Sequence, residues 1–265
     1  MITSTDQLNR TIVLQNYPTR IISLVPSQTE LLFDLGLRDE VVGITKFCIH
    51  PDEWFHSKTR IGGTKDVNLE KIKSLEPDLI IANKEENDED QISLLMSDFP
   101  VWVSDVRNLE DALEMIRELS KFVNRKSNGE DVIEKISFEF EALKSKNTKL
   151  ISCAYMIWKN PLMTAGGDTF ISEMLKYAGL KNIFSERERY PQITIEDLQN
   201  ADPEFLFLSS EPFPFKEKNI SEFRIALPEA RVFLVDGEMF SWYGSRLMKA
   251  PSYFSQLGEK IKSAS

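Results

Sequence analysis

The sequence is poor in cysteine and histidine, with two of each among its 265 residues. Cys48 and Cys153 are far apart and form no CxxC motif, so we expect no disulfide framework and two small buried side chains. His50 and His56 lack the third histidine of a zinc site. For the pair Cys48 and His50, a role in packing is favoured over a role as metal ligands. Two histidines also offer little for acid–base chemistry, and no Ser-His-Asp arrangement is evident. These absences argue against an enzyme and predict no catalytic residues.

Long apolar runs and leader features are also missing. No run reaches the roughly 18 apolar residues of a membrane-spanning helix. The N-terminal Met-Ile-Thr-Ser-Thr-Asp-Gln-Leu lacks the basic and apolar regions of a secretory signal. These features predict a soluble chain without a membrane address. The pair Gly62-Gly63 has neither the GxxxxGK[ST] nor the GxGxxG spacing of a phosphate-binding loop.

Basic residues are in the minority, with 32 Lys and Arg against 42 Asp and Glu and a net charge of −10. Such a surface repels phosphate backbones and anionic lipid, so we expect no nucleic-acid partner. The densest acidic run extends from Asn83 to Asp90. It has no EF-hand pattern, and a solvated turn beside a helix N-terminus is favoured over a calcium site.

One stretch of the sequence occurs twice. Residues 68–81 (NLEKIKSLEPDLII) and 194–207 (TIEDLQNADPEFLF) align without a gap, almost half a chain length apart. Each copy opens with an N-cap residue, places an acid (Glu70 or Glu196) in the first helical turn, turns at acid-Pro-acid and enters an apolar strand. The repetition predicts two similar lobes, since a solenoid would show many short repeats.

Strand-like and helix-like segments alternate along the chain. The apolar segments 20–25 and 41–45 flank a helix-like stretch in which Ser27 and Glu30 have the spacing of a capping box. Further apolar segments that resemble strands lie at 11–15, 79–82, 101–103, 149–157, 205–208 and 232–235. The alternation predicts an α/β fold class, with two Rossmann-like lobes that have central, mainly parallel sheets.

A long segment between residues 127 and 145 is predicted to form one helix that joins the lobes. Its apolar side chains recur at helical spacing and its remaining charge is balanced: Val132, Ile133, Ile136, Phe140 and Leu143. A helix of that length braces two lobes, and no flexible Gly/Ser linker is present, so we expect little lobe closure. We place the N-terminal α/β lobe at 1–123, the linking backbone helix at 124–148 and the C-terminal α/β lobe at 149–265.

Several motifs occur in an order that is also found in a known family. The first half carries them at 20–36 (RIISLVPSQTELLFDLG), 41–44, 62–63, 68–72 and 77–80, and the second half at 169–171, 179, 182–184, 190–191 and 236–246. Together they cover nearly the whole chain. In these motifs the chain resembles the helical-backbone (class III) substrate-binding proteins of cobalamin and iron-siderophore ABC importers, and within them the vitamin B12-binding proteins.

The resemblance implies a function in transport. A member of this family holds its ligand in the cleft between two α/β lobes joined by one rigid helix. It implies capture of cobalamin or a related corrinoid and delivery to the permease dimer of an ABC importer. The metal chelate is then cargo, and no intrinsic cofactor is expected. A monomer in the periplasm or at the cell surface is implied, although the missing signal keeps a cytoplasmic sensor or scavenger open.

The resemblance also gives roles to single residues. Glu70 and Glu196 become docking acids for permease arginines, and an exposed carboxylate at a helix N-terminus suits a bidentate arginine. Flat aromatic walls suit a broad, amphipathic macrocycle, and His50 becomes a candidate axial cobalt ligand. The candidate ligand-binding residues, some of which rest on their positions after strands, are Phe47, His50, Trp158, Tyr190, Glu238, Met239, Phe240, Ser241, Trp242 and Arg246.

The chain departs from the family pattern in its first lobe. Two tryptophans that line the cobalamin cleft of the best-known member align with Thr64 and Asn83. Aromatic lining is therefore reduced, and haem or a ferric siderophore remains an alternative ligand.

Overall fold

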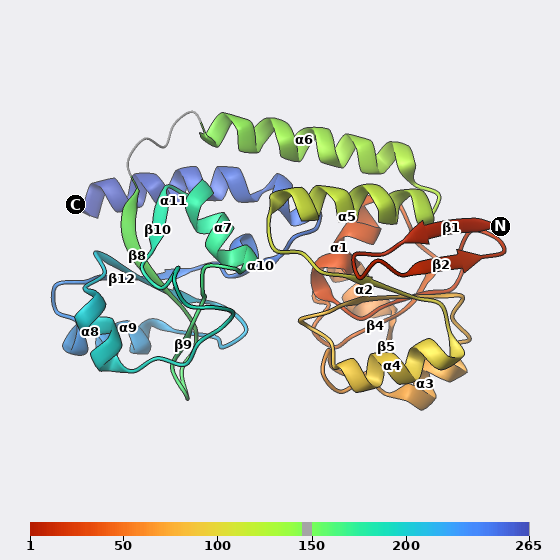
Figure 1. Cartoon of the computed structure of the whole chain (residues 1–265), viewed down its shortest axis with the longest axis horizontal. Helices are drawn as coiled ribbons and strands as arrows, with labels where there is room; N and C mark the ends of the chain where they lie inside the picture. Colours follow the sequence, from red (N-terminus) through yellow and green to blue (C-terminus); the bar gives the residue numbers. More distant parts are fainter. Residues whose placement is uncertain (145–149, 265) are drawn as a thin grey trace. The chain divides into compact units, whose positions relative to one another are not determined.

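The computed structural model describes residues 1–144 and 150–264. The chain forms two compact units: unit 1 comprises Met1–Lys135 with Tyr243–Arg246, and unit 2 comprises Ile136–Trp242 with Leu247–Ser265. The boundary falls inside helix α6 (Lys126–Lys144), labelled in Figure 1. Of the linking helix predicted at 124–148, positions 145–148 lie outside the described residues. The lobe boundary at 123 stays a prediction, and the boundary predicted at 149 lies outside the described residues.

Unit 1 is built on a five-stranded parallel sheet in the order β5-β4-β3-β6-β7. A two-stranded antiparallel hairpin of β1 and β2 precedes this sheet in the chain. Strands β3, β6 and β7 are buried along their whole length, because parallel sheets are covered on both faces. The strands are β1 (Ile2–Thr5), β2 (Thr11–Leu14), β3 (Ile21–Ser23), β4 (Val41–Ile44), β5 (Thr59–Arg60), β6 (Leu79–Asn83) and β7 (Val101–Ser104).

Helices cover both faces of this sheet. In Figure 1, α3 and α4 lie below the sheet of unit 1 and α1 and α5 lie above it. Three of these helices begin at a side chain that accepts a hydrogen bond from the backbone N–H three residues later: Asn68 for α3, Asp88 for α4 and Asn108 for α5. The helices of unit 1 are α1 (Pro26–Asp34), α2 (Asp52–Ser57), α3 (Leu69–Ser74), α4 (Glu89–Asp98) and α5 (Leu109–Phe122).

The capping box predicted at the start of α1 is wrong. Val25 is the N-cap residue, no side chain caps the helix, and Pro26 occupies the first helical position. The ring of proline fixes φ near its helical value, so the helix begins two residues before the position that the Ser27 spacing indicated. Ser27 and Glu30 are instead buried, and Glu30 has another partner, described below.

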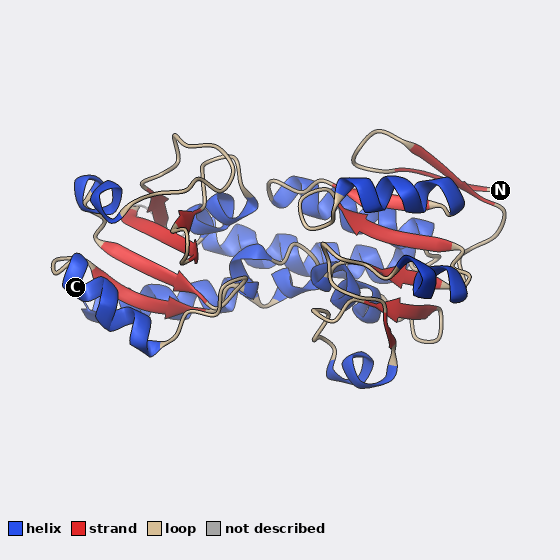
Figure 2. Cartoon of the chain, turned by 90° about the horizontal axis from the view of Figure 1, so that it is seen from below, coloured by secondary structure: helices blue, strands red, loops and turns tan. Residues whose placement is uncertain are grey.

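Unit 2 repeats the same architecture. Its parallel sheet has the order β10-β8-β11-β12, and the short β9 pairs antiparallel with β8. Figure 2 shows the parallel strands of each unit side by side, with helices flanking them. These observations confirm the predicted α/β class with parallel sheets. The strands are β8 (Ile151–Trp158), β9 (Met163–Thr164), β10 (Leu180–Asn182), β11 (Phe205–Ser209) and β12 (Arg231–Val235).

The end of the chain differs from the sequence expectation. A helix was predicted from about Arg246, whereas a 3₁₀ turn, η1 (Ser245–Met248), comes first and the last helix begins at Ala250. Within the described residues no helix has both the length and the apolar character needed to cross a lipid bilayer. The remaining helices are α7 (Phe170–Tyr177), α8 (Ile195–Ala201), α9 (Glu217–Ala226), α10 (Glu238–Ser241) and α11 (Ala250–Ala264).

The repeated stretch forms the same helix-to-strand unit in both units, as predicted. The first copy is α3 followed by β6, and the second copy is α8 followed by β11. Thr194 caps α8 in a full capping box with Asp197, and Asn68 caps α3. Each copy therefore presents its first helical turn in the same structural context.

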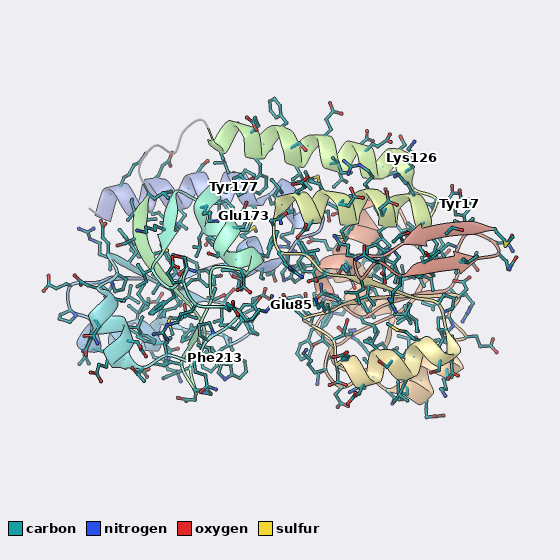
Figure 3. All side chains as sticks on the ribbon, in the orientation of Figure 1. Tyr17, Glu85, Lys126, Glu173, Tyr177 and Phe213 are labelled. Carbon is teal, nitrogen blue, oxygen red and sulfur yellow. The ribbon has the colours of Figure 1, made fainter. Side chains whose placement is uncertain are left out.

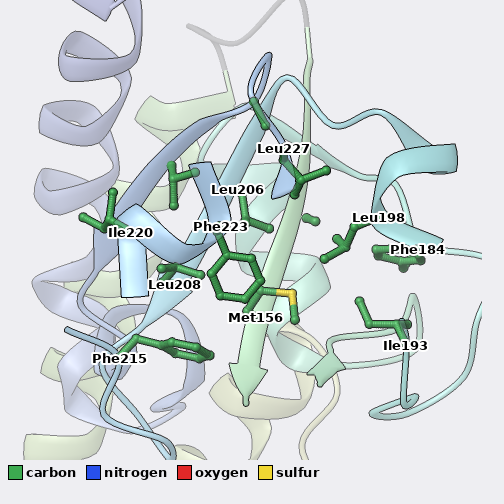
Figure 4. Packing of buried hydrophobic residues seen from close by; sticks show 13 residues of the cluster. Met156, Phe184, Ile193, Leu198, Leu206, Leu208, Phe215, Ile220, Phe223 and Leu227 are labelled. Carbon is green, nitrogen blue, oxygen red and sulfur yellow. The ribbon is translucent and has the colours of Figure 1, made fainter. Parts of the chain in front are cut away.

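One hydrophobic cluster of unit 2 forms between its sheet and the helices α8 and α9. Figure 4 shows side chains of β8 and β11 surrounded by residues of the two helices. Leu206 is fully buried within this cluster, whereas Ile225 on α9 is 84% exposed. The buried members are Ala154, Met156, Phe184, Ile193, Leu198, Leu206, Leu208, Phe215, Ile220, Phe223, Leu227, Ala230 and Val232.

We expect Leu206→Ala to lower the free energy of unfolding by about 2–5 kcal/mol, because truncation loses buried apolar area and leaves a cavity. Ile225→Ala is the matched control and should change it by less than about 0.5 kcal/mol. Urea unfolding followed by circular dichroism measures both. Equal effects of the two variants would contradict the assignment of this core.

Candidate functional site

Loops at the carboxyl ends of parallel strands are where open α/β sheets bind ligands. In unit 1 the relevant loops follow β3, β4 and β6, and in unit 2 they follow β8, β10, β11 and β12. All predicted ligand residues except Arg246 lie in or at the start of these loops: Phe47 and His50 after β4, Trp158 at the end of β8, Tyr190 after β10, and Glu238 to Trp242 after β12.

The loop after β4 has a buried cysteine next to an exposed aromatic ring. Cys48 is fully buried, its sulfur lies 3.1 Å from the hydroxyls of Thr29 and Thr45, and burial raises the pKa of its thiol to about 11. Phe47 beside it is 51% exposed, and His50 is half-buried. The thiol is thus a packing group, as predicted, while Phe47 offers an accessible apolar surface.

The acidic run after β6 is an ordered turn. The Asn83 side-chain oxygen accepts hydrogen bonds from the backbone N–H groups of Glu85 and Glu86 (2.8 and 3.0 Å). Its amide donates to Ser104 Oγ at 3.0 Å, and the Asn87 side chain accepts from Asn83 N–H at 2.8 Å. Among the described residues, no group of three or more His, Cys, Asp or Glu side chains is placed to hold a metal ion.

Aromatic rings gather after β8 and β11 of unit 2. Trp158 is 38% exposed, and its indole N–H donates to Asn160 O at 3.0 Å. Its ring packs edge-on against Phe213, labelled in Figure 3, at 5.7 Å between centroids. Phe213 in turn packs on Phe215 at 4.7 Å. The three rings form a partly exposed apolar wall at this edge.

A half-buried carboxylate lies beside the segment after β12. Glu211 Oε1 accepts hydrogen bonds from Ser241 Oγ at 2.5 Å and from the Trp242 indole N–H at 2.9 Å. Burial raises the pKa of Glu211, and the nearby charges of Glu238 and Asp236 raise it further. Glu211 thereby ties α10 to the loop after β11.

The ligand-binding residues predicted at 238–242 occupy half-buried and fully packed positions. Glu238, Met239 and Ser241 are half-buried. Phe240 is fully buried and packs on Tyr155 and Phe254, and Trp242 is only 5% exposed. Tyr190 is half-buried. The roles of these residues in ligand binding stay predictions.

Arg246 is engaged within unit 1. Its Nε donates to Glu30 Oε2 at 2.8 Å and its Nη2 donates to Glu30 Oε1 at 2.9 Å. Both side chains are about 8% exposed. The bidentate geometry is that of a strong arginine–carboxylate pair. The ligand role of Arg246 stays a prediction.

The two repeated acids are exposed. Glu70 lies in the first turn of α3 and Glu196 in the first turn of α8. Among the described residues neither carboxylate forms a hydrogen bond or an ion pair. The neighbouring Asp197 is used internally: the Thr194 backbone N–H and the Arg187 guanidinium lower its pKa to about 2. Glu70 and Glu196 therefore present negative charge to solvent.

Sequence reasoning missed three functional candidates near these loops: Glu30, Glu86 and Glu211. Glu30 was interpreted as a helix cap, and Glu86 as one acid in a solvated turn. Their partners lie 216 and 157 residues away, so no local pattern indicates them. Glu211 precedes a proline, which indicates a turn but not burial.

Comparison with known proteins gives one family. The model of the periplasmic binding protein family matches residues 21–227. The vitamin B12-binding protein of Vibrio parahaemolyticus is 30% identical over 75% of this chain and 74% of its own length. The uncharacterized ABC transporter substrate-binding lipoprotein YvrC of Bacillus subtilis is 27% identical over 98% of this chain and 85% of its own length.

Solved structures share the fold. The periplasmic vitamin B12-binding protein BtuF of Vibrio cholerae has a TM-score of 0.80, 24% identity, and covers 93% of this chain and 99% of its own. The periplasmic haem-binding protein RhuT of Roseiflexus sp. RS-1 has a TM-score of 0.79, 20% identity, and covers 92% and 98%. At these identities the likeness establishes the two-lobe α/β fold.

Proposed function

This chain belongs to the periplasmic binding protein family, and we propose that it captures cobalamin or a related corrinoid and delivers it to an ABC importer. The observation that carries the proposal is the 30% identity with a vitamin B12-binding protein over three quarters of both chains. The protein then acts as a binding protein without catalysis of its own, outside the cytoplasmic membrane and as a monomer.

The exposed carboxyl-edge surfaces suit a macrocycle. Phe47 in unit 1 and Trp158 in unit 2 are partly accessible to solvent. Trp158 packs on Phe213, which packs on the buried Phe215. Flat rings of this kind remove a large apolar area of ligand from water and need few hydrogen bonds. His50 is proposed as an axial ligand to the metal of the bound chelate.

The charges near the surface of unit 2 favour a corrinoid over an anionic chelate. In unit 2, Glu211, Asp236 and Glu238 lie close enough to interact electrostatically. In unit 1 the guanidinium of Arg246 is already neutralised by Glu30. Carboxylate-bearing haem or a siderophore anion would meet like charge in unit 2, whereas the amide side chains of a corrinoid donate hydrogen bonds to carboxylates.

A permease is the proposed protein partner. Glu70 and Glu196 are proposed to contact arginines of the two permease subunits, one acid from each unit. Their exposure and their equivalent positions in the repeated helix-to-strand unit support this role.

Isothermal titration with cyanocobalamin, haemin and a ferric hydroxamate tests the ligand. We expect cyanocobalamin to bind with a dissociation constant of about 1 μM or lower, equivalent to roughly 8 kcal/mol of binding free energy. Trp158→Ala should weaken binding, whereas Phe138→Ala, which removes a 73% exposed ring from α6, should not. Tighter binding of haemin or the hydroxamate would identify that compound class as the ligand. Binding of none of the three would reject the transport function.

A further inference from the structure

Residues Tyr243–Arg246 belong to unit 1, although their neighbours on both sides in the sequence belong to unit 2. The chain therefore leaves unit 2 directly after Trp242 and returns to it at Leu247. The segment that precedes the crossing, residues 236–242, is the one proposed to contact the ligand. The anchoring of Tyr243–Arg246 thus bears on the position of that segment.

Several contacts hold this short segment, residues 243–246, to unit 1. Arg246 forms the buried bidentate ion pair with Glu30. A Cβ atom on Gly244 would lie 2.5 Å from Ser27 O and 3.2 Å from Leu31 Cβ, so only glycine allows this close approach to α1. The Tyr243 hydroxyl donates to Glu86 Oε1 at 2.8 Å. Backbone packing, an ion pair and a charged hydrogen bond act together.

The partner of Tyr243 comes from the acidic turn after β6. Asn83 orders the backbone of Glu85, labelled in Figure 3, and of Glu86, and so holds the Glu86 carboxylate in place. Tyr243 is 5% exposed, and burial followed by the negative charge of Glu86 raises its pKa well above the ordinary value. The phenol therefore keeps its proton and remains a donor at neutral pH.

The amino end of segment 236–242 is held by hydrogen bonds within unit 2. The Asp236 N–H donates to the Tyr253 hydroxyl at 2.8 Å, and the Gly237 N–H donates to Ser210 Oγ at 2.9 Å. The Trp242 indole is fixed by Glu211. Two adjacent residues, Trp242 and Tyr243, are consequently hydrogen-bonded to carboxylates of different units.

We propose that Tyr243 is a positioning residue, whose hydrogen bond to Glu86 fixes the carboxyl end of segment 236–242 for ligand binding. The inference rests on the proposed corrinoid function. Without this bond the end of the segment has more conformational freedom, and the ligand must supply the cost of ordering it. Affinity for a ligand at segment 236–242 then depends on Glu86, a residue of unit 1 that need not touch the ligand.

Tyr243→Phe tests the inference, because it removes the hydroxyl and keeps the ring. We expect cyanocobalamin to dissociate about tenfold faster, the order of effect of losing a hydrogen bond to a charged group. Glu86→Gln should have a smaller effect, because its side-chain carbonyl still accepts. Tyr17→Phe, at a 46% exposed ring in the loop between β2 and β3, is the matched control and should leave dissociation unchanged.

Hydrogen exchange of the ligand-free protein separates positioning from general stability. In Tyr243→Phe, amides of 236–242 should exchange several-fold faster, while those of β6 and β11 stay protected. Unchanged exchange in 236–242, or unchanged dissociation with a bound corrinoid, overturns the inference. If the unaltered protein binds no corrinoid, the proposed function fails, and the exchange measurement still decides the role of Tyr243.

Discussion

Reversing both repeated acids, in Glu70→Lys/Glu196→Lys, is expected to abolish importer-coupled uptake and leave corrinoid affinity unchanged. Both carboxylates are exposed in the first turn of a helix and have no hydrogen-bond or ion-pair partner among the described residues. Losing a close charge pair in an interface costs about 2–5 kcal/mol, and a lysine opposite an arginine adds repulsion. Two such losses weaken docking by at least about a thousandfold.

Ligand-stimulated ATPase activity and uptake in liposomes that contain the importer measure this loss. The control is Glu110→Lys/Glu217→Lys, which reverses two other exposed first-turn acids, on α5 and α9. It makes the same change in net charge and the same unfavourable contact with a helix dipole, about 0.3–1 kcal/mol each. Coupling that survives in the Glu70/Glu196 variant, or is lost equally in the control, would reject the docking role.

Removing Glu30 is expected to produce a large loss of stability. In Glu30→Ala the Arg246 guanidinium remains buried without its carboxylate, and breaking such a pair costs about 3–5 kcal/mol. Because the pair anchors Tyr243–Arg246 to α1, the loss should fall on unit 1. Urea unfolding followed by tryptophan fluorescence measures it.

Two further variants show whether the loss comes from an unpaired buried charge. Glu30→Met/Arg246→Met removes both charges and should recover most of the stability, since apolar residues of similar volume replace buried ion pairs well. Glu114→Ala breaks an exposed pair with Arg117, in which the side chains are 54% and 42% exposed, and should cost about 1 kcal/mol or less. A cost for Glu30→Ala as small as that for Glu114→Ala would show that the Glu30–Arg246 pair contributes little.

The repeated stretch shows what was predictable about the site. Asn68 and Thr194 as helix caps, the acids that follow them and the apolar strands are all features of short segments, and each formed as expected. The exposure of Glu70 and Glu196 follows from the same local pattern, because a first-turn acid that does not face the sheet remains in water.

The α1 helix shows where such reasoning ends. Ser27 and Glu30 have the spacing of a capping box, but Pro26 is the first residue of the helix and Glu30 pairs with Arg246. A cap of about 1 kcal/mol competes with a buried ion pair that costs several times more to leave unmade. The spacing alone carries no information about the arginine.

The two α/β units, their parallel strands, the repeated helix-to-strand unit and the family were predictable from the amino-acid sequence, because periodicity, caps and motifs act over a few residues. The pairing of Glu30 with Arg246, of Glu86 with Tyr243 and of Glu211 with Trp242 is evident in the folded structure alone. Contacts across 216 and 157 residues arise when packing brings distant segments together, and the low dielectric of the interior then makes each polar partner decisive.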